Sequence, residues 1–140
     1  MTQSTLSNLG THSCNITRQA EDAISRKYLL GKLDSSGQRI RVCDGSDFPI
    51  GIITDEAEAP RDGEEAIVNV ALLGSPTTLQ AVASAPIEVG TLLVPADDGK
   101  VQPLPSDTGN YYVIGFALTR AAADDDLLEF MSCVPQMYAI

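Results

Sequence analysis

The side chains best suited to nucleophilic or metal chemistry are one histidine, His12, and three cysteines, Cys14, Cys43 and Cys133. A Ser-His-Asp or Cys-His site needs an imidazole held rigidly within hydrogen-bond reach of its nucleophile. His12 lies in a polar N-terminal segment without periodic patterning, where such rigidity is not expected. The spacing of the four residues matches no zinc pattern. We therefore expect no catalytic residue and no metal site.

Three acidic clusters invite a calcium interpretation. None of them has the twelve-residue loop closed by a bidentate glutamate. Asp and Gly are also the residues that tight turns require, so turn chemistry is the preferred interpretation. No Gly-rich phosphate loop is present, and the lack of tryptophan disfavours an aromatic-lined glycosidase cleft. We expect no cofactor and no enzymatic activity. The clusters are Asp44-Gly45-Ser46-Asp47, Asp97-Asp98-Gly99 and Asp124-Asp125-Asp126.

The overall charge restricts the classes of partner. Among 140 residues, 19 acidic side chains face 9 basic ones, which gives a net charge of -10. Such a charge repels nucleic acids and anionic membranes, because binding to either depends on clustered cations. The odd number and wide spacing of the cysteines predict free thiols in a reducing cytoplasm. We expect a protein-binding subunit with no nucleic-acid or membrane partner.

The chain repeats itself after a polar start. One unit covers about residues 20–74 and the other about residues 83–134. Short apolar runs between Gly, Pro and Asp clusters predict three or four strands in each unit, with a short helix at most. One such unit could hardly cover its own apolar face, so we expect a single β domain over residues 20–140. The predicted fold is mainly β: a compact β-barrel or sandwich built from two related units, with an extended N-terminal arm over residues 1–19.

Four pairs of landmarks occur in the same order in both units. Gly51 and Gly115, each inside an apolar run, are expected to mark a bulge or a close backbone approach. Gly at the end of an Asp-led turn supplies the positive φ of a tight hairpin. The pairs are Ala23-Ile24 and Pro86-Ile87, Tyr28-Leu29-Leu30 and Thr91-Leu92-Leu93, Ile50-Gly51-Ile52 and Ile114-Gly115-Phe116, and Ala66-Ile67-Val68-Asn69-Val70 and Asp126-Leu127-Leu128-Glu129-Phe130.

The C-terminal segment, residues 131–140, is largely apolar and carries no charged side chain. Exposed in a monomer it would be adhesive, and Met and Tyr are favoured at interfaces. The alternative is a last strand and tail that pack on the chain's own core. Our predicted residues for contact between subunits are Val134, Met137, Tyr138 and Ile140.

The sequence resembles the capsid decoration proteins of tailed bacteriophages. The resemblance rests on residues 87–104 with their Asp-Gly-Lys-Val turn, on residues 112–118 with an Ile-Gly strand, and on the closing strand over residues 126–130. The first unit departs from the pattern, because Lys27 stands where the second unit has Gly90 and Gln38-Arg39 replaces Lys100-Val101. The resemblance implies a β-rich, often trimeric and non-enzymatic subunit that is made in the host cytoplasm and binds major capsid protein on the outer capsid surface.

An N-terminal arm suits such a role, since it can add a strand to a sheet edge of a capsid subunit. The arm residues predicted to bind the capsid are Thr2, Ser4, Leu6, Leu9, His12, Cys14 and Ile16. The alternative function is a carbohydrate- or small-ligand-binding β module, which exposed Tyr111-Tyr112 on a cleft would favour.

Overall fold

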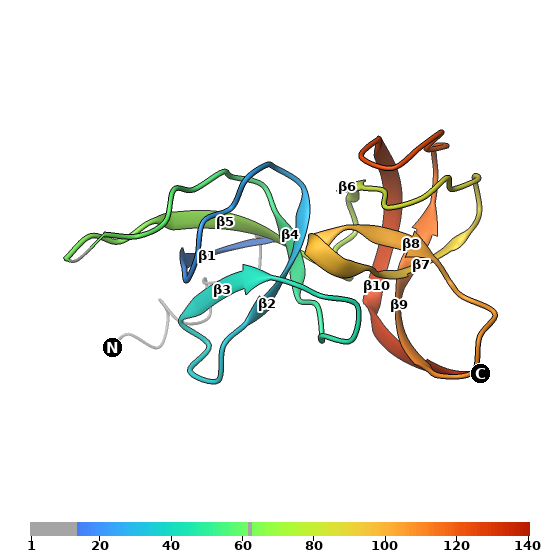
Figure 1. Ribbon diagram of the computed structural model, residues 1–140, viewed down its shortest axis with the longest axis horizontal. Helices are drawn as coiled ribbons and strands as arrows, with labels where there is room; N and C mark the ends of the chain where they lie inside the picture. Colours follow the sequence, from blue (N-terminus) through green and yellow to red (C-terminus); the bar gives the residue numbers. More distant parts are fainter. Residues whose placement is uncertain (1–13, 62) are drawn as a thin grey trace.

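The computed structural model describes residues 14–61 and 63–140, which form strands and turns without an α-helix. The prediction of a mainly β fold is confirmed. Figure 1 shows two units side by side, the first containing β1 to β5 and the second β6 to β10. The elements are β1 (Asn15–Ala20), β2 (Leu29–Leu33), β3 (Arg39–Val42), β4 (Gly51–Ile53), β5 (Ile67–Leu72), β6 (Thr78–Val82), β7 (Leu92–Pro95), a 3-10 turn (Asp97–Gly99), β8 (Val101–Pro103), β9 (Asn110–Ala117) and β10 (Leu127–Ala139).

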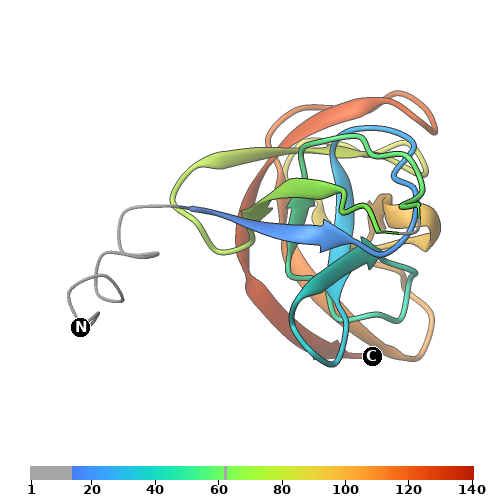
Figure 2. The same cartoon turned by 90° about the vertical axis from the view of Figure 1, so that its left-hand side faces the viewer.

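The first unit is a closed barrel with the strand order β1-β3-β2-β4-β5. Strand β1 pairs antiparallel with β5 along its length, and it closes the barrel by parallel pairing of Gln19 with Arg39 and of Ala20 with Ile40. In Figure 2, β1 crosses the front of the barrel between β5 and β3. Closure removes the free sheet edges that would otherwise invite aggregation.

The second unit repeats this order with β6 in the place of β1. Its sheet runs β6-β10-β9-β7-β8, and a parallel bridge between Ala83 and Val101 joins the two outer strands. Each unit therefore contains five strands, where the sequence predicted three or four. The fifth is the closing strand, whose partners lie far away along the chain, so that local patterning gives it little signal.

Strand register places most of the repeated landmarks at equivalent positions. Ile24 bridges Ala57 in the first unit, as Ile87 bridges Ala121 in the second. The two internal glycines are also equivalent, because Gly51 pairs with Gly31 on β2 and Gly115 with Leu93 on β7, and each partner lies two residues before the residue that faces Ile40 or Val101. The landmark Tyr28-Leu29-Leu30 is the one displaced by one residue, since Leu30 pairs with Ile52 as Leu92 pairs with Phe116.

The predicted close backbone approach occurs at both of these glycines. A Cβ at Gly51 would collide with the carbonyl oxygen of Ala71, and one at Gly115 with that of Met131. Gly115 also has φ of +146°, which L-residues rarely adopt. It lies beside the bulge between Ser132 and Gln136 of β10, so the glycine accommodates this irregularity.

A shared core unites the two units. One buried cluster contains Leu30, Cys43 and Ile52 of the first unit together with Phe130 and other residues of the second. A second cluster, which includes Ile24, Ile40 and Ile53, fills the first barrel. Full burial of a Leu, Ile or Phe side chain contributes roughly 1.5–3 kcal/mol, so each unit depends on the other for much of its stability.

The structure corrects the boundary of the N-terminal arm. Ile16 pairs with Val70 and packs against the core of the first barrel, and the carbonyl of Cys14 accepts a hydrogen bond of 2.8 Å from the Leu72 N–H. Residues 15–19 are thus part of the barrel rather than of an arm outside it. The outward side chains of β1 are polar because that side faces water. Thr2, Ser4, Leu6, Leu9 and His12 lie outside the described residues.

Candidate interaction surfaces

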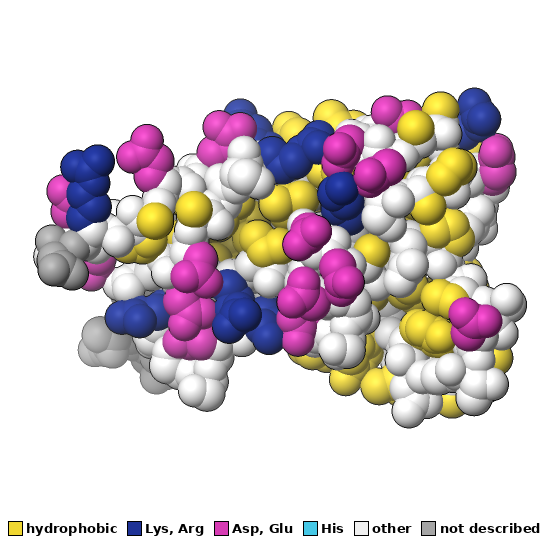
Figure 3. Space-filling view, viewed as in Figure 1, with side chains coloured by type: hydrophobic (Ala, Val, Ile, Leu, Met, Phe, Trp, Pro, Cys, Tyr) yellow, Lys and Arg dark blue, Asp and Glu magenta, His cyan; other side chains and the backbone are white. Residues whose placement is uncertain are grey.

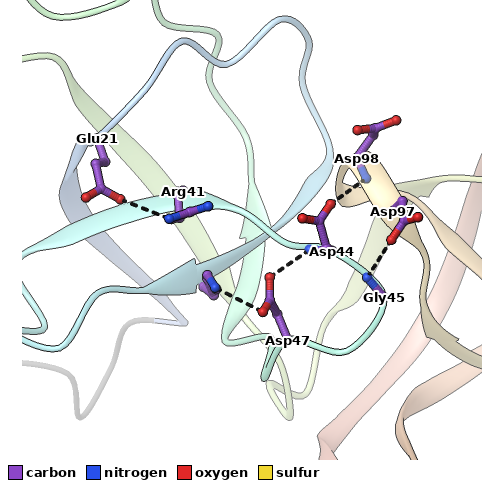
Figure 4. A network of polar contacts seen from close by, with 8 residues as sticks. Glu21, Arg41, Asp44, Gly45, Asp47, Asp97 and Asp98 are labelled. Atoms are coloured by element: carbon purple, nitrogen blue, oxygen red, sulfur yellow. Dashed lines mark hydrogen bonds and ion pairs between the residues drawn. The ribbon is translucent and has the colours of Figure 1, made fainter.

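The acidic loops form the joint between the units. The N–H of Gly99 donates to the carbonyl of Cys43 at 2.7 Å, and the N–H of Gly45 donates to Oδ1 of Asp97 at 3.0 Å. A further bond of 3.3 Å joins the N–H of Asp98 to Oδ1 of Asp44. Figure 4 shows these carboxylates directed at backbone N–H groups across the joint. They therefore serve as backbone acceptors, but for the neighbouring unit rather than within their own turns.

Asp47 stabilises the loop on the first-unit side of this joint. Its carboxylate accepts the N–H of Asp44 at 2.9 Å and forms an ion pair of 2.9 Å with Lys32. Partial burial opposes ionisation of Asp47, but these two donors, with the charge of Arg41, keep its pKa below the ordinary value. The loop is thereby held in one conformation beside the 3-10 turn.

The third acidic cluster belongs to a second contact between the units. The ammonium of Lys100 lies 2.7 Å from Asp125 and 2.9 Å from Asp124, and Arg26 of the first unit lies 3.5 Å from Asp125. Hydrogen bonds to the two carboxylates raise the pKa of Lys100, and Lys100 lowers that of Asp125. Asp126 accepts the N–H groups of Ala122 and Ala123. Within residues 14–61 and 63–140, no group of three or more His, Cys, Asp or Glu side chains could hold a metal ion.

The three cysteines are free thiols. Cys43 is fully buried at the joint, and burial, aided by the charge of Asp47, raises its pKa to about 12. Burial also raises the pKa of Cys133. A thiol whose pKa is raised is a poor nucleophile near neutral pH, because the thiolate is the reactive form. Cys14 lies beside β1 and is partly exposed.

A two-stranded extension of the second unit, here called the distal ribbon, consists of residues 110–113 of β9 and 136–139 of β10. It continues past the bulge of β10, with Tyr111 opposite Tyr138 and Tyr112 opposite Met137. Figure 1 shows this end of the chain projecting away from β6. The predicted contact residues lie on it or at its base and are 43–60 % exposed: Val134, Met137, Tyr138 and Ile140.

The two faces of the distal ribbon differ. Directly opposed residues of an antiparallel pair point to the same side, so Tyr112 and Met137 share one face and Tyr111 and Tyr138 share the other. The ring of Tyr112 makes an edge-to-face contact with Phe48 of the first unit, with centroids 5.2 Å apart. Tyr111 and Tyr112 therefore do not form a common platform of the kind that stacks on a sugar.

A second apolar surface lies on the outer side of the second sheet, here called the outer face. Leu92, Phe116 and Met131 are cross-strand partners on β7, β9 and β10 and form one row, with Thr78 of β6 at its end. Their side chains are 41 %, 37 % and 47 % exposed. Next to the row is an open hollow of about 310 Å³ lined by Gln80, Thr119, Leu127, Leu128 and Glu129.

The outer face was not among the predicted sites. Its residues lie on three strands that are distant in sequence, so only the register brings them together. A signal was present in β10, where Leu127 and Met131 occupy outward positions that an ordinary antiparallel sheet fills with polar residues. The space-filling view in Figure 3 shows most charged side chains gathered over the first unit and the joint, whereas the second unit on this side has hydrophobic patches and only a few charged side chains near its edges.

Comparison with known proteins gives a likeness of fold. No family model and no curated protein sequence matches the chain. The solved structures include a similar phage protein, described as "The crystal structure of head fiber gp8.5 N base in bacteriophage phi29". The alignment has a TM-score of 0.63 and covers 89 % of this chain and 97 % of that one, at 19 % identity. The two chains therefore share a fold over nearly their whole lengths. No helix in the described part of the chain is long and apolar enough to cross a membrane.

Proposed function

We propose that this chain is a structural protein of a phage virion, and that it decorates the outer surface of the capsid by binding major capsid protein. The observation that carries the proposal is the likeness in fold to the N base of a phage head fiber, over 89 % of the chain. The order of the duplicated sequence motifs, which resembles that of decoration proteins, is the second support. The proposed role is non-enzymatic: the protein stabilises the head and acts as a homo-oligomer, with a trimer as the first choice.

The chemistry of the chain suits this role. A net charge of -10 keeps an external coat protein away from the packaged genome. The two units share a core and a hydrogen-bonded joint, so the subunit can act as a rigid clamp between neighbouring capsid proteins. Many identical weak contacts over a lattice sum through multivalency.

Residues 1–13 contain no Asp, Glu, Lys or Arg. We assign them, rather than residues 15–19, to the capsid contact. Strand addition to an edge of a capsid subunit would give affinity through main-chain hydrogen bonds, with side chains such as Leu6 and Leu9 adding apolar contact.

The test is binding to matching empty heads, with cosedimentation and electron microscopy as readouts. The wild-type protein should appear as regular knobs at symmetry positions of the heads. A variant lacking residues 2–13 should keep its fold and oligomeric state but lose most of its binding. A variant with Arg120→Ala, which removes only an exposed ion pair with Glu88, serves as a binding-competent control. Folded wild-type protein that fails to bind the heads would refute the proposal, and full binding by the truncated variant would refute the assignment of the arm.

A further inference from the structure

The distal ribbon exceeds what the β fold requires. Its strands β9 and β10 have 8 and 13 residues, whereas their counterparts β4 and β5 close the first barrel with 3 and 6. Two-stranded ribbons alone are marginally stable in water, and this one exposes Met137 and Tyr138 on opposite sides. An exposed apolar extension of this kind is typical of an interaction site.

Charge restricts the surface that this ribbon can meet. Residues 108–119 and 130–140, which include both strands of the ribbon, carry no charged side chain. Two copies of a chain with a net charge of -10 repel one another unless they meet through neutral surfaces. The chain has such a second neutral surface in the apolar row Leu92, Phe116 and Met131 of its outer face.

The free edge of β10 in the ribbon is less suited to binding another chain than the two faces of the ribbon are. Gly109 and Ile140 exchange both backbone hydrogen bonds, so the alternation of the ladder directs the N–H groups of Met137 and Ala139 away from β9. Pro135, which precedes them in β10, has no N–H to donate. Such a short edge that begins with proline resists continuous strand addition, which favours contact through side chains.

We infer that the distal ribbon of one copy docks on the outer face of a second copy. The Tyr138 side of the ribbon, which is not occupied by Phe48, supplies an aromatic ring with a hydroxyl. The outer face supplies the apolar row and, beside it, the hollow rimmed by Gln80 and Glu129, whose polar groups can accept that hydroxyl. The inference rests on the proposed homo-oligomer and names the two surfaces that form it.

The two surfaces are different patches, so the contact is heterologous: each copy offers one ribbon and one face. Repetition of such a contact closes into a cyclic ring when the rotation between copies allows it. A trimer would then contain three identical contacts. This arrangement differs from a symmetric dimer, in which the ribbons of two copies would pair with each other.

The test is the mass of the full chain in solution, measured by sedimentation and light scattering over a concentration series. Tyr138→Asp alters the ribbon and Met131→Asp alters the outer face, and each should weaken self-association by at least about tenfold. Ile67→Asp is the matched control, because Ile67 is 55 % exposed but lies on the first unit. Circular dichroism should show an unchanged β fold for all three variants, since the altered side chains are exposed.

Mixing the two defective variants separates the possible geometries. Tyr138→Asp keeps an intact outer face and Met131→Asp keeps an intact ribbon, so their mixture should form one-to-one pairs although neither variant self-associates. A wild-type monomer at every concentration, an effect of Ile67→Asp equal to the others, or a mixture that stays monomeric would overturn the inference. Binding to empty heads is scored separately: heads that bind a monomeric wild-type protein would refute the inference and the proposed oligomer but support the proposed capsid binding. An oligomer that forms through these two surfaces but does not bind the heads would support the inference and refute the proposed capsid binding.

Discussion

The two units share one strand order, but the turn after β2 in the first unit and the equivalent turn after β7 in the second make different contacts. In the first unit, the turn after β2 closes on itself: Oδ1 of Asp34 accepts the hydroxyl of Ser36 at 2.7 Å and the N–H of Arg39 at 3.3 Å. In the second unit, the turn after β7 reaches outward, and Oδ1 of Asp97 accepts the N–H of Gly45. Both turns keep their backbone hydrogen bonds, so a duplicated module can become a rigid pair when the leading Asp side chain of one turn binds the partner unit instead of its own turn.

The glycines of these turns show the same contrast. Gly37 and Gly99 have φ of +74° and +75°, so both satisfy the same backbone requirement. A Cβ on Gly37 would meet nothing within 4 Å, whereas one on Gly99 would approach Leu29, Leu30 and Val42 closely. Only the second turn is inserted into its neighbour.

The largest expected effect on stability comes from shortening β1, the strand that closes the first barrel. Deleting residues 2–17 removes half of β1 and with it the antiparallel and core contacts of Ile16, so we expect the first barrel to open and cooperative folding to be lost. Deleting residues 2–13 leaves β1 whole and should leave the midpoint of thermal unfolding near that of the wild type. Circular dichroism during heating measures both. A cooperative, wild-type-like transition in the longer deletion would show that the first barrel is stable without β1.

Labelling of Cys43 tests whether the units open separately. The side chain is buried in the cluster that both units share, and with a pKa of about 12 its thiol stays protonated at pH 8. In a variant with Cys14→Ser and Cys133→Ser, we expect alkylation only through global unfolding, at a free energy equal to that from urea denaturation. For a domain of this size that is about 5–15 kcal/mol. Labelling at a clearly lower free energy would mean that the joint opens on its own.

Local sequence patterns predicted the repeat and the β class but not how the repeat closes. Ile24 and Ile87 occupy the same place in the order of landmarks of the two units, and both make equivalent bridges. The sequence predicts an arm over β1 because residues 1–19 are rich in Ser, Thr, Asn and Gln and show no strand periodicity; in the structure, Arg18 lies on the same side of β1 as Ile16 and Ala20. The Arg18 guanidinium leaves the barrel and donates to the carbonyl of Gly37, so its presence in a barrel strand is compatible with burial of its stem.

For a similar reason, only one of the two exposed apolar surfaces could be predicted from the sequence. An uncharged run over residues 131–140 is visible in the sequence, and it identified the exposed side chains of the distal ribbon. The outer face is assembled from Leu92, Phe116 and Met131, which only the register of three strands makes neighbours. Its recognition requires the pairing, and pairing at a bulge cannot be read from alternation alone.

Substitutions at Gly37 and Gly99, which occupy equivalent turns, measure how much the joint contributes to the free energy of unfolding. Gly37→Ala should cost about 1 kcal/mol of unfolding free energy, which is the cost of a left-handed conformation for a residue with a side chain. Gly99→Ala should cost about 3 kcal/mol, because the added methyl group also overpacks the joint. Urea denaturation measures both. Equal costs would indicate that the joint relaxes freely around Gly99 and that insertion of this turn does little to hold the units together.

The smallest effect concerns the acid dependence of the joint. Asp47 has a pKa below its ordinary value, because the Asp44 N–H and Lys32 outweigh its partial burial. A depressed pKa in the folded state stabilises the protein above the unfolded value of about 4, and this contribution disappears as the pH falls through the folded value. Asp47→Asn should therefore cost less than about 1 kcal/mol at pH 7, as expected for a partly exposed ion pair, and nothing measurable near pH 2. Lys32→Gln should reproduce part of this convergence in urea denaturation at the two pH values. A difference between wild type and Asp47→Asn that persists undiminished in acid would show that the carboxylate acts through its shape and neutral hydrogen bonds rather than its charge.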